Sequence, residues 1–196
     1  MSRRQLLVLG VAFEGGLGLA AWGLGWLLDQ PCAESWKWRV TDVARGAAAS
    51  LPMVAAFAVS LVWPVGPLAG IKRFTQEVIQ PLFASCTVLD LAVISICAGV
   101  GEELLFRGVV QAALSRWLGL PAGLAVASVL FGLLHPFSLA YVVLASAMGV
   151  YLGWVWLASG NLLIASTAHA VYDFLVLFFL TTRPPGREER KMKKED

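Results

Sequence analysis

Long apolar segments with short polar breaks make up almost the whole chain, and this pattern limits its fold more than any other feature. A helix needs about 20 apolar residues to cross the ~30 Å hydrocarbon core of a membrane. Polar breaks and prolines divide the chain into apolar segments at residues 6–28, 46–69, 82–118, 121–135, 138–158 and 162–182. We therefore predict an all-α, polytopic membrane helical bundle with about six transmembrane spans.

The segment 82–118 is too long for one straight span. At ~1.5 Å per residue it would reach ~55 Å, whereas the hydrocarbon core is ~30 Å thick. The sequence therefore predicts one long or broken helix in this region, which is broken, strongly tilted or partly interfacial. Gly99 and Gly101 are the expected weak points.

Composition supports a single membrane domain. Hydrophobic residues make up 58% of the chain and charged residues 14%, against about 25% charged residues in soluble domains. We expect one transmembrane domain at residues 1–182, with no soluble domain attached. The net charge of +2 does not indicate nucleic-acid binding, because the basic residues gather at the two ends. The three cysteines are scattered through apolar sequence, which predicts buried thiols and no disulfide framework.

Basic residues flank the first and last spans, namely Arg3, Arg4, Arg183, Arg187, Arg190, Lys191, Lys193 and Lys194. By the positive-inside rule, both termini are predicted to be cytoplasmic, which requires an even number of crossings. Residues 183–196 are expected to form a basic, disordered cytoplasmic tail. The expected location is therefore integral to a membrane, which we take to be a prokaryotic plasma membrane.

Six polar residues lie deep inside the later apolar segments: Glu102, Glu103, Arg107, His135, His169 and Asp173. An ionisable group at membrane depth is costly, so each indicates a functional site. If the chain reverses near residue 119, Glu102 and His135 lie ~25 Å from the turn and thus at matching depth. His169 and Asp173 lie ~14 Å and ~20 Å along the last span, so all of these groups could meet in the inner half of the bilayer.

Each motif segment also carries a pair of residues at i,i+4 spacing, which places the two side chains on one helix face. The pairs are Glu103 with Arg107, Phe131 with His135, and His169 with Asp173. An ion pair between Glu103 and Arg107 would leave Glu102, ~100° around the helix, free for another role.

These residue types suit proton-transfer chemistry. Glu102 could act as a general base on water, and His135 and His169 could carry protons or polarise the attacked carbonyl. Asp173 could orient His169 or stabilise a developing charge. The implied reaction is hydrolysis of a carbonyl bond inside the membrane, foremost a peptide bond.

The three motifs resemble those of the CAAX protease and bacteriocin-processing (CPBP, or Abi) family of intramembrane endopeptidases. They read E-E-x-x-x-R from Glu102, F-x-x-x-H from Phe131 and H-x-x-x-N/D from His169. The resemblance covers roughly residues 80–180. It implies a helical membrane fold with a polar cavity, in which Glu102 activates water with help from His135 and His169. The last position, often Asn in this family, is Asp173 here, and an ionised Asp cannot donate a hydrogen bond to an oxyanion.

The same resemblance leaves a metal open. No cofactor is expected, although zinc is possible, with Glu102, His135 and His169 as candidate ligands. A metal-free mechanism is favoured because H-E-x-x-H is absent from the sequence.

Other functions stay open at this point. Intramembrane Glu and His also serve proton-coupled transporters, and an inactive scaffold of the same fold would keep the same residues. The expected partners are the lipid bilayer and a membrane-associated protein or peptide substrate, prenylated (CAAX-type) proteins included, with no nucleic acid. The oligomeric state is not predicted. Glu14, inside the first segment, either reaches a polar group on another helix or lies near the interface as a spectator.

Overall fold

The computed structural model describes residues 1–182, and all of the regular structure in this range is helical. The predicted tail at 183–196 lies outside the described residues. The helices are α1 (Arg3–Leu27), α2 (Val40–Ala49), α3 (Leu51–Val62), α4 (Pro67–Phe74), the π-helix η1 (Thr75–Ile79), α5 (Gln80–Phe83), α6 (Val88–Glu103), the π-helix η2 (Leu104–Gln111), α7 (Ala112–Leu118), α8 (Leu120–Leu133), α9 (Leu139–Ser159) and α10 (Leu162–Thr182).

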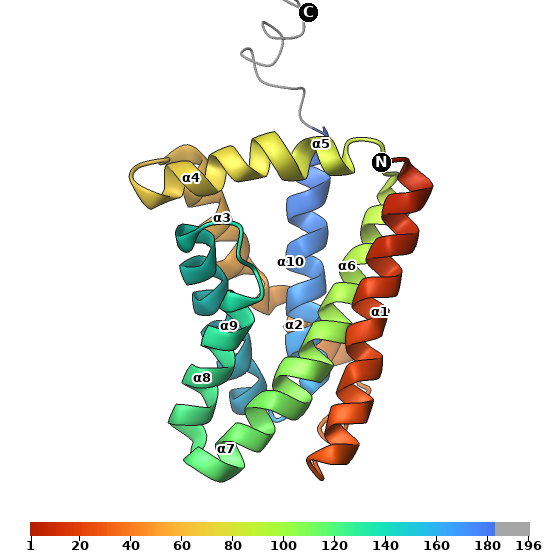
Figure 1. Cartoon of the computed structure of the whole chain (residues 1–196), viewed down its shortest axis with the longest axis vertical. Helices are drawn as coiled ribbons and strands as arrows, with labels where there is room; N and C mark the ends of the chain where they lie inside the picture. Colours follow the sequence, from red (N-terminus) through yellow and green to blue (C-terminus); the bar gives the residue numbers. More distant parts are fainter. Residues whose placement is uncertain (183–196) are drawn as a thin grey trace, which may run out of the picture.

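The two ends of the described chain lie at the same end of the bundle. Figure 1 shows the start of α1 and the end of α10 there, with α4, η1 and α5 lying across that end. The turn between α7 and α8 lies at the opposite end.

Four helical stretches are long and apolar enough to cross a membrane, namely Arg3–Leu27, Val40–Val62, Leu139–Ser159 and Leu162–Thr182. A fifth span results if the bent pair Pro67–Phe83 and Val88–Leu118 is counted as one. The remaining apolar helix, α8, has 14 residues and is ~21 Å long, which is short of the ~30 Å hydrocarbon core. The predicted helical membrane bundle is confirmed, although α8 is shorter than a usual span.

The second span lies earlier in the chain than the sequence predicted. It runs from Val40 to Val62 rather than over 46–69. Proline has no backbone N–H and disfavours helical structure in the residue before it, so Pro64 ends the helix at this point. Residues 70–81, the break expected between the segments 46–69 and 82–118, instead belong to the helices that lie across the end of the bundle.

The long third segment is broken, but not at the predicted glycines. The chain bends by 117° between α5 and α6, and a π-helical stretch follows at Leu104–Gln111. Gly99 and Gly101 lie in the unbroken helix α6. Their role is packing: a Cβ on Gly99 would collide with α10 at Ala170, and one on Gly101 would collide with the backbone of Glu14 in α1. The prediction that these glycines break the helix is wrong.

Short turns connect the helices that carry the motifs. Gly119 joins α7 to α8 with a φ of +85°, a conformation that a residue with a side chain rarely adopts. The predicted reversal near residue 119 is therefore confirmed. The three cysteines are unpaired; Cys32 is buried as predicted, whereas Cys86 and Cys97 are only half-buried.

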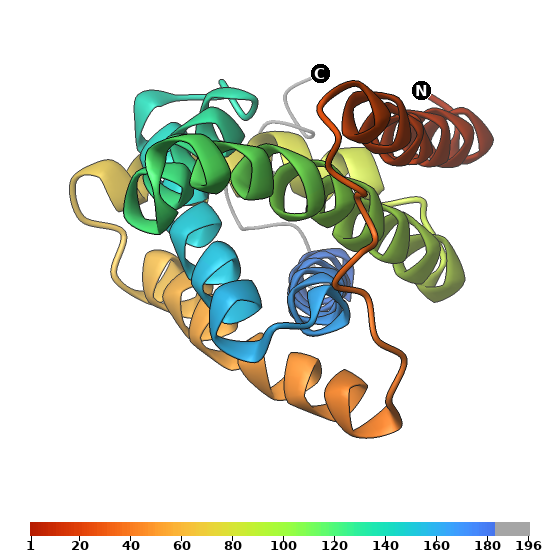
Figure 2. The same cartoon turned by 90° about the horizontal axis from the view of Figure 1, so that it is seen from below.

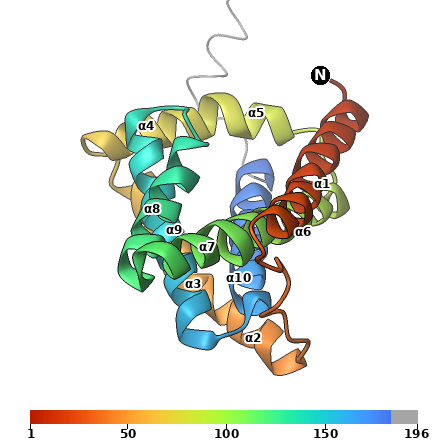
Figure 3. The same cartoon turned by 60° about the horizontal axis from the view of Figure 1, so that its bottom comes forward.

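Helix α10 lies at the centre of the bundle. In the view from below it has α2 and α3 on one side and the helix formed by α6, η2 and α7 on the other (Figure 2). Figure 3 shows this second helix running from α6 through α7 and passing in front of α10. Helix α1 packs against the outer side of α6 and η2. Helices α10 and α6 are therefore direct neighbours, and η2 contacts both α8 and α10.

Candidate active site

Glu103 is the centre of the polar network that joins the motif helices. Its side chain is 0% exposed, and its Oε1 accepts hydrogen bonds from Arg107 Nη1 (2.8 Å) and His169 Nδ1 (2.9 Å). The partners come from η2 and α10, whereas Glu103 itself ends α6. A buried carboxylate is tolerated when it is paired and hydrogen-bonded, and Oε1 of Glu103 meets both conditions, whereas its Oε2 is buried without a hydrogen-bond partner.

Arg107 links this network to two further helices. Its Nη2 donates to the carbonyl oxygen of Gly149 in α9 (3.0 Å), and its guanidinium lies 4.8 Å from the ring centroid of Phe131 in α8. One turn along, Gln111 donates in the same way to the carbonyl oxygen of Gly153. Arg107 therefore connects α8 and α9 to the helix that continues α6, and these contacts stabilise the relative positions of the three helices.

The π-helical segment η2 determines which way these side chains point. A π turn has one more residue than an α turn, so side chains after Glu103 are rotated relative to a regular helix. Arg107 and Gln111 both lie in this segment and both reach α9. π segments occur often at functional sites, which fits this one, because η2 contains Arg107 of the first motif.

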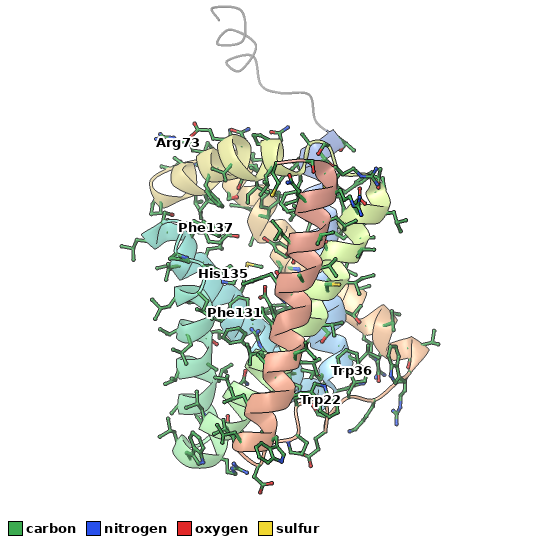
Figure 4. All side chains as sticks on the ribbon, turned by 45° about the vertical axis from the view of Figure 1, so that its right-hand side comes forward. Trp22, Trp36, Arg73, Phe131, His135 and Phe137 are labelled. Carbon is green, nitrogen blue, oxygen red and sulfur yellow. The ribbon has the colours of Figure 1, made fainter. Side chains whose placement is uncertain are left out.

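Phe131 brings the two histidines close together. Its ring centroid lies 4.8 Å from that of His135 and 6.0 Å from that of His169, and it also packs on Phe106 at 5.0 Å. Figure 4 shows Phe131 and His135 on the same side of the bundle, with His135 nearer the end that carries Arg73. The sequence placed Phe131 on the same face as His135, and the structure also packs it against His169.

His135 lies just beyond the end of α8, and its ring orientation is set by one hydrogen bond. Its Nδ1 lies 2.8 Å from the carbonyl oxygen of Phe131. A carbonyl oxygen can only accept, so Nδ1 carries the proton in this contact. The neutral ring then has no proton on Nε2, which is free to accept one.

His169 lies between two carboxylates. Its Nδ1 bonds Glu103, and its Nε2 lies 3.5 Å from Oδ2 of Asp173, an ion-pair distance rather than a hydrogen bond. The His169 side chain is buried, whereas that of Asp173 is 27% exposed. Both ring nitrogens of His169 therefore face a carboxylate oxygen.

Glu102 has a different environment from Glu103, although the two are adjacent. Glu102 is 8% exposed, and its Oε2 is buried without a hydrogen-bond partner. The predicted separation of the two carboxylates is thus present: Glu103 pairs with Arg107, and Glu102 is outside that pair.

Glu14 from α1 also reaches this group, and the sequence alone did not assign it. Its Oε2 is buried without a hydrogen-bond partner, and its charge interacts with those of Glu102, Asp173 and His169. The backbone of Glu14 packs against Gly101, next to Glu102 in α6, so Glu14 stands beside the motif helices, although its Oε2 makes no hydrogen bond to them. The only sequence signal for this was an acidic residue inside an apolar span.

The arrangement does not offer a ready three-ligand metal site. Within residues 1–182, no three His, Cys, Asp or Glu side chains lie close enough together to hold an ion. Of the candidate ligands, both His169 nitrogens face carboxylates and the Nδ1 of His135 bonds a backbone carbonyl. We therefore derive no reaction step through a metal.

Comparison with known families gives one match, over residues 84–175, to the model described as Type II CAAX prenyl endopeptidase Rce1-like. Comparisons with curated proteins and with solved structures find no significant match. The matched region contains all six of the polar residues that the sequence singled out. The resemblance to the CAAX protease family is therefore confirmed for the part of the chain that carries its motifs.

Proposed function

We propose that this protein is an intramembrane endopeptidase that hydrolyses peptide bonds of membrane-associated or prenylated (CAAX-type) proteins or peptides. The match to a CAAX prenyl endopeptidase family supports a hydrolase of this type. One observation carries the proposal: Oε1 of Glu103 accepts hydrogen bonds from both Arg107 and His169, whereas the adjacent Glu102 is bonded by neither of them. A base that activates water needs such a free carboxylate.

In the proposed reaction, Glu102 takes a proton from a water molecule, and the water oxygen bonds to the carbonyl carbon of the scissile peptide. The proton then passes to the peptide nitrogen as the C–N bond breaks, which restores the Glu102 carboxylate. Positive charge on His169 favours the negative oxygen that develops at the carbonyl. Glu103 and Asp173 hold that charge in place from its two sides.

His135 is assigned to proton transfer rather than to carbonyl polarisation. The hydrogen bond from its Nδ1 to the Phe131 carbonyl leaves an unprotonated Nε2 on the neutral ring. This nitrogen can accept a proton from water or from Glu102. It can donate to a carbonyl oxygen only after the ring has become positively charged.

Asp173 is assigned to orientation of His169. The alternative, hydrogen-bond donation to the oxyanion, requires a protonated Asp. The 3.5 Å separation from His169 Nε2 supports the first role. We also propose, from the basic flanking residues, that both termini face the cytoplasm.

The test is cleavage of a quenched-fluorescence peptide library by the purified protein in liposomes. Glu102→Ala and His135→Ala should each lower kcat by about 100-fold or more, the usual contribution of a general acid or base. The matched control is Glu77→Ala, because Glu77 is an exposed glutamate far from this network. Normal cleavage by the folded Glu102→Ala variant would rule out the proposed mechanism.

A further inference from the structure

An apolar groove runs along α10 on the side of this helix away from the proposed catalytic residues. Its volume is about 410 Å³, which is within the range of small-molecule sites. Val171 and Phe174 form part of its floor, and they lie about 200° and about 140° around the helix from His169. Most of the side chains that line the groove are apolar or aromatic. The groove is therefore a second site, and its lining suits an apolar ligand.

Two close helix contacts form the sides of this groove. A Cβ on Gly99 of α6 would collide with Ala170 of α10, and a Cβ on Gly46 of α2 would collide with Thr167 of α10. Helices α6 and α2 therefore both touch α10, and the groove lies between them. On the α6 side it is lined by Ile96, whose side chain is exposed.

The loop before α2 covers one end of the groove and is held firmly in place. The side chain of Asn161 accepts a hydrogen bond from the backbone N–H of Lys37 and donates one to its carbonyl oxygen, both at 2.9 Å. Trp36 and Trp38, on either side of Lys37, therefore line the groove with their ring centroids 5.8 Å apart. Figure 4 shows Trp36 toward the end of the bundle away from Arg73.

This end of the groove lies at the expected membrane surface. The candidate spans Val40–Val62 and Leu162–Thr182 both begin beside the tryptophan loop, and tryptophan is enriched where a membrane meets water. From Leu163 to Phe174 the groove floor extends ~16 Å along α10. One leaflet accounts for ~15 Å of the ~30 Å hydrocarbon core. The length therefore suits one lipid acyl chain that enters from the surface.

Positive charge is available at this end of the groove. Arg39 is exposed, and within residues 1–182 none of the ion pairs includes it. The acid Asp42 is already bonded by Arg45 and Asn161. Glu34 lines a different pocket, next to α1. A guanidinium matches the geometry of a phosphate, so Arg39 complements the headgroup of an anionic lipid.

We propose that this groove binds one anionic phospholipid, with an acyl chain between α2, α6 and α10 and the phosphate at Arg39. The lipid supports α10 from behind, on the face opposite to His169. It is a bound component of the fold and is not consumed. This inference goes beyond the proposed peptidase activity and does not depend on it.

The test is native mass spectrometry of the protein in detergent micelles, titrated with phosphatidylglycerol or with phosphatidylcholine of the same acyl chains. The native chain should bind one phosphatidylglycerol about 5-fold or more tightly than phosphatidylcholine, because one basic residue near an anionic headgroup contributes about 5-fold. Arg39→Gln should remove this preference. Arg73→Gln is the matched control, because Arg73 is also exposed but lies at the opposite end of the bundle.

A second variant examines the acyl-chain site. Val171→Trp fills the groove and should weaken binding of both lipids by about 10-fold or more, the equivalent of about two buried methylene groups. Val143→Trp is its control, because Val143 is exposed on α9 and does not line the groove. This control should bind both lipids as the native chain does.

Equal lipid affinities of Val171→Trp and Val143→Trp would overturn the acyl-chain site, and equal lipid preferences of Arg39→Gln and Arg73→Gln would overturn the role of the headgroup. Arg39 is exposed, so its variant keeps the proposal testable even if Val171→Trp fails to fold. Displacement of the lipid by a farnesylated peptide, or a dimer in place of the lipid complex, would assign the groove to another occupant and overturn the proposal. Cleavage is not measured, so loss of the proposed function would leave this result unchanged.

Discussion

Replacement of Arg107 by Met should destabilise the protein strongly, and the structure gives the size of the effect. The change removes the cationic partner of Glu103, which is 0% exposed and cannot turn toward water. Loss of one member of a buried ion pair costs about 3–5 kcal/mol. The bond to the Gly149 carbonyl is lost as well, but His169 still donates to Glu103 and offsets part of the cost. We therefore expect a loss of about 3 kcal/mol.

The measurement is the free energy of unfolding in mixed detergent micelles, for Arg107→Met, Glu103→Gln and the double variant. The double variant removes both charges, so it should recover part of the stability, with a coupling energy of about 2 kcal/mol. Arg45→Met is the matched control: the Arg45–Asp42 pair is as short, at 2.9 Å, but the Arg45 side chain is 69% exposed. This control should cost less than about 1 kcal/mol. An Arg107→Met effect no larger than that of Arg45→Met would refute the reasoning.

Further predictions concern packing, the last motif and metals. Gly108→Ala should lower the free energy of unfolding by about 1–3 kcal/mol, because the new Cβ would collide with the Cys32 carbonyl. Gly16→Ala should be neutral or slightly stabilising, because a Cβ there meets nothing within 4 Å. Equal unfolding free energies of the two variants would contradict this prediction. Asp173→Asn should lower kcat about 10-fold or more with little change in KM, because it removes the charge that faces His169; an unchanged kcat in the peptide assay would exclude this role. Exhaustive chelation should leave peptide cleavage unchanged, and restoration of lost activity by zinc would instead establish a metal-dependent enzyme.

Local regularities in the sequence predicted one part of the site correctly. The i,i+4 spacing of Glu103 and Arg107 predicted their ion pair, and the reversal predicted near residue 119 is the turn between α7 and α8. Both follow from helix geometry within a short stretch of chain. The family motifs likewise identified the segment that matches an endopeptidase family.

Contacts between helices could not be predicted from the sequence. The bond from His169 to Glu103 depends on how α10 is rotated against α6, and no spacing within one helix encodes that angle. The backbone carbonyls of Gly149 and Gly153 accept from Arg107 and Gln111, and a backbone acceptor leaves no sequence signature. The π segment η2 shifts the face of the helix in a way that α-helical periodicity does not predict.

The position of Glu14 on α1 has a consequence for the order in which the protein is assembled. Gly101, against which the backbone of Glu14 packs, is synthesised roughly 90 residues after Glu14, so at about 5–20 residues per second the first helix waits roughly 4–18 s for this contact. During that time the acid has no neighbour, and an acidic residue near the centre of an inserting helix costs about 2.5–3.5 kcal/mol. We expect α1 to enter the bilayer reversibly at first and to become fixed only when α6 arrives, so the helix that is made first is among the last to be held in place.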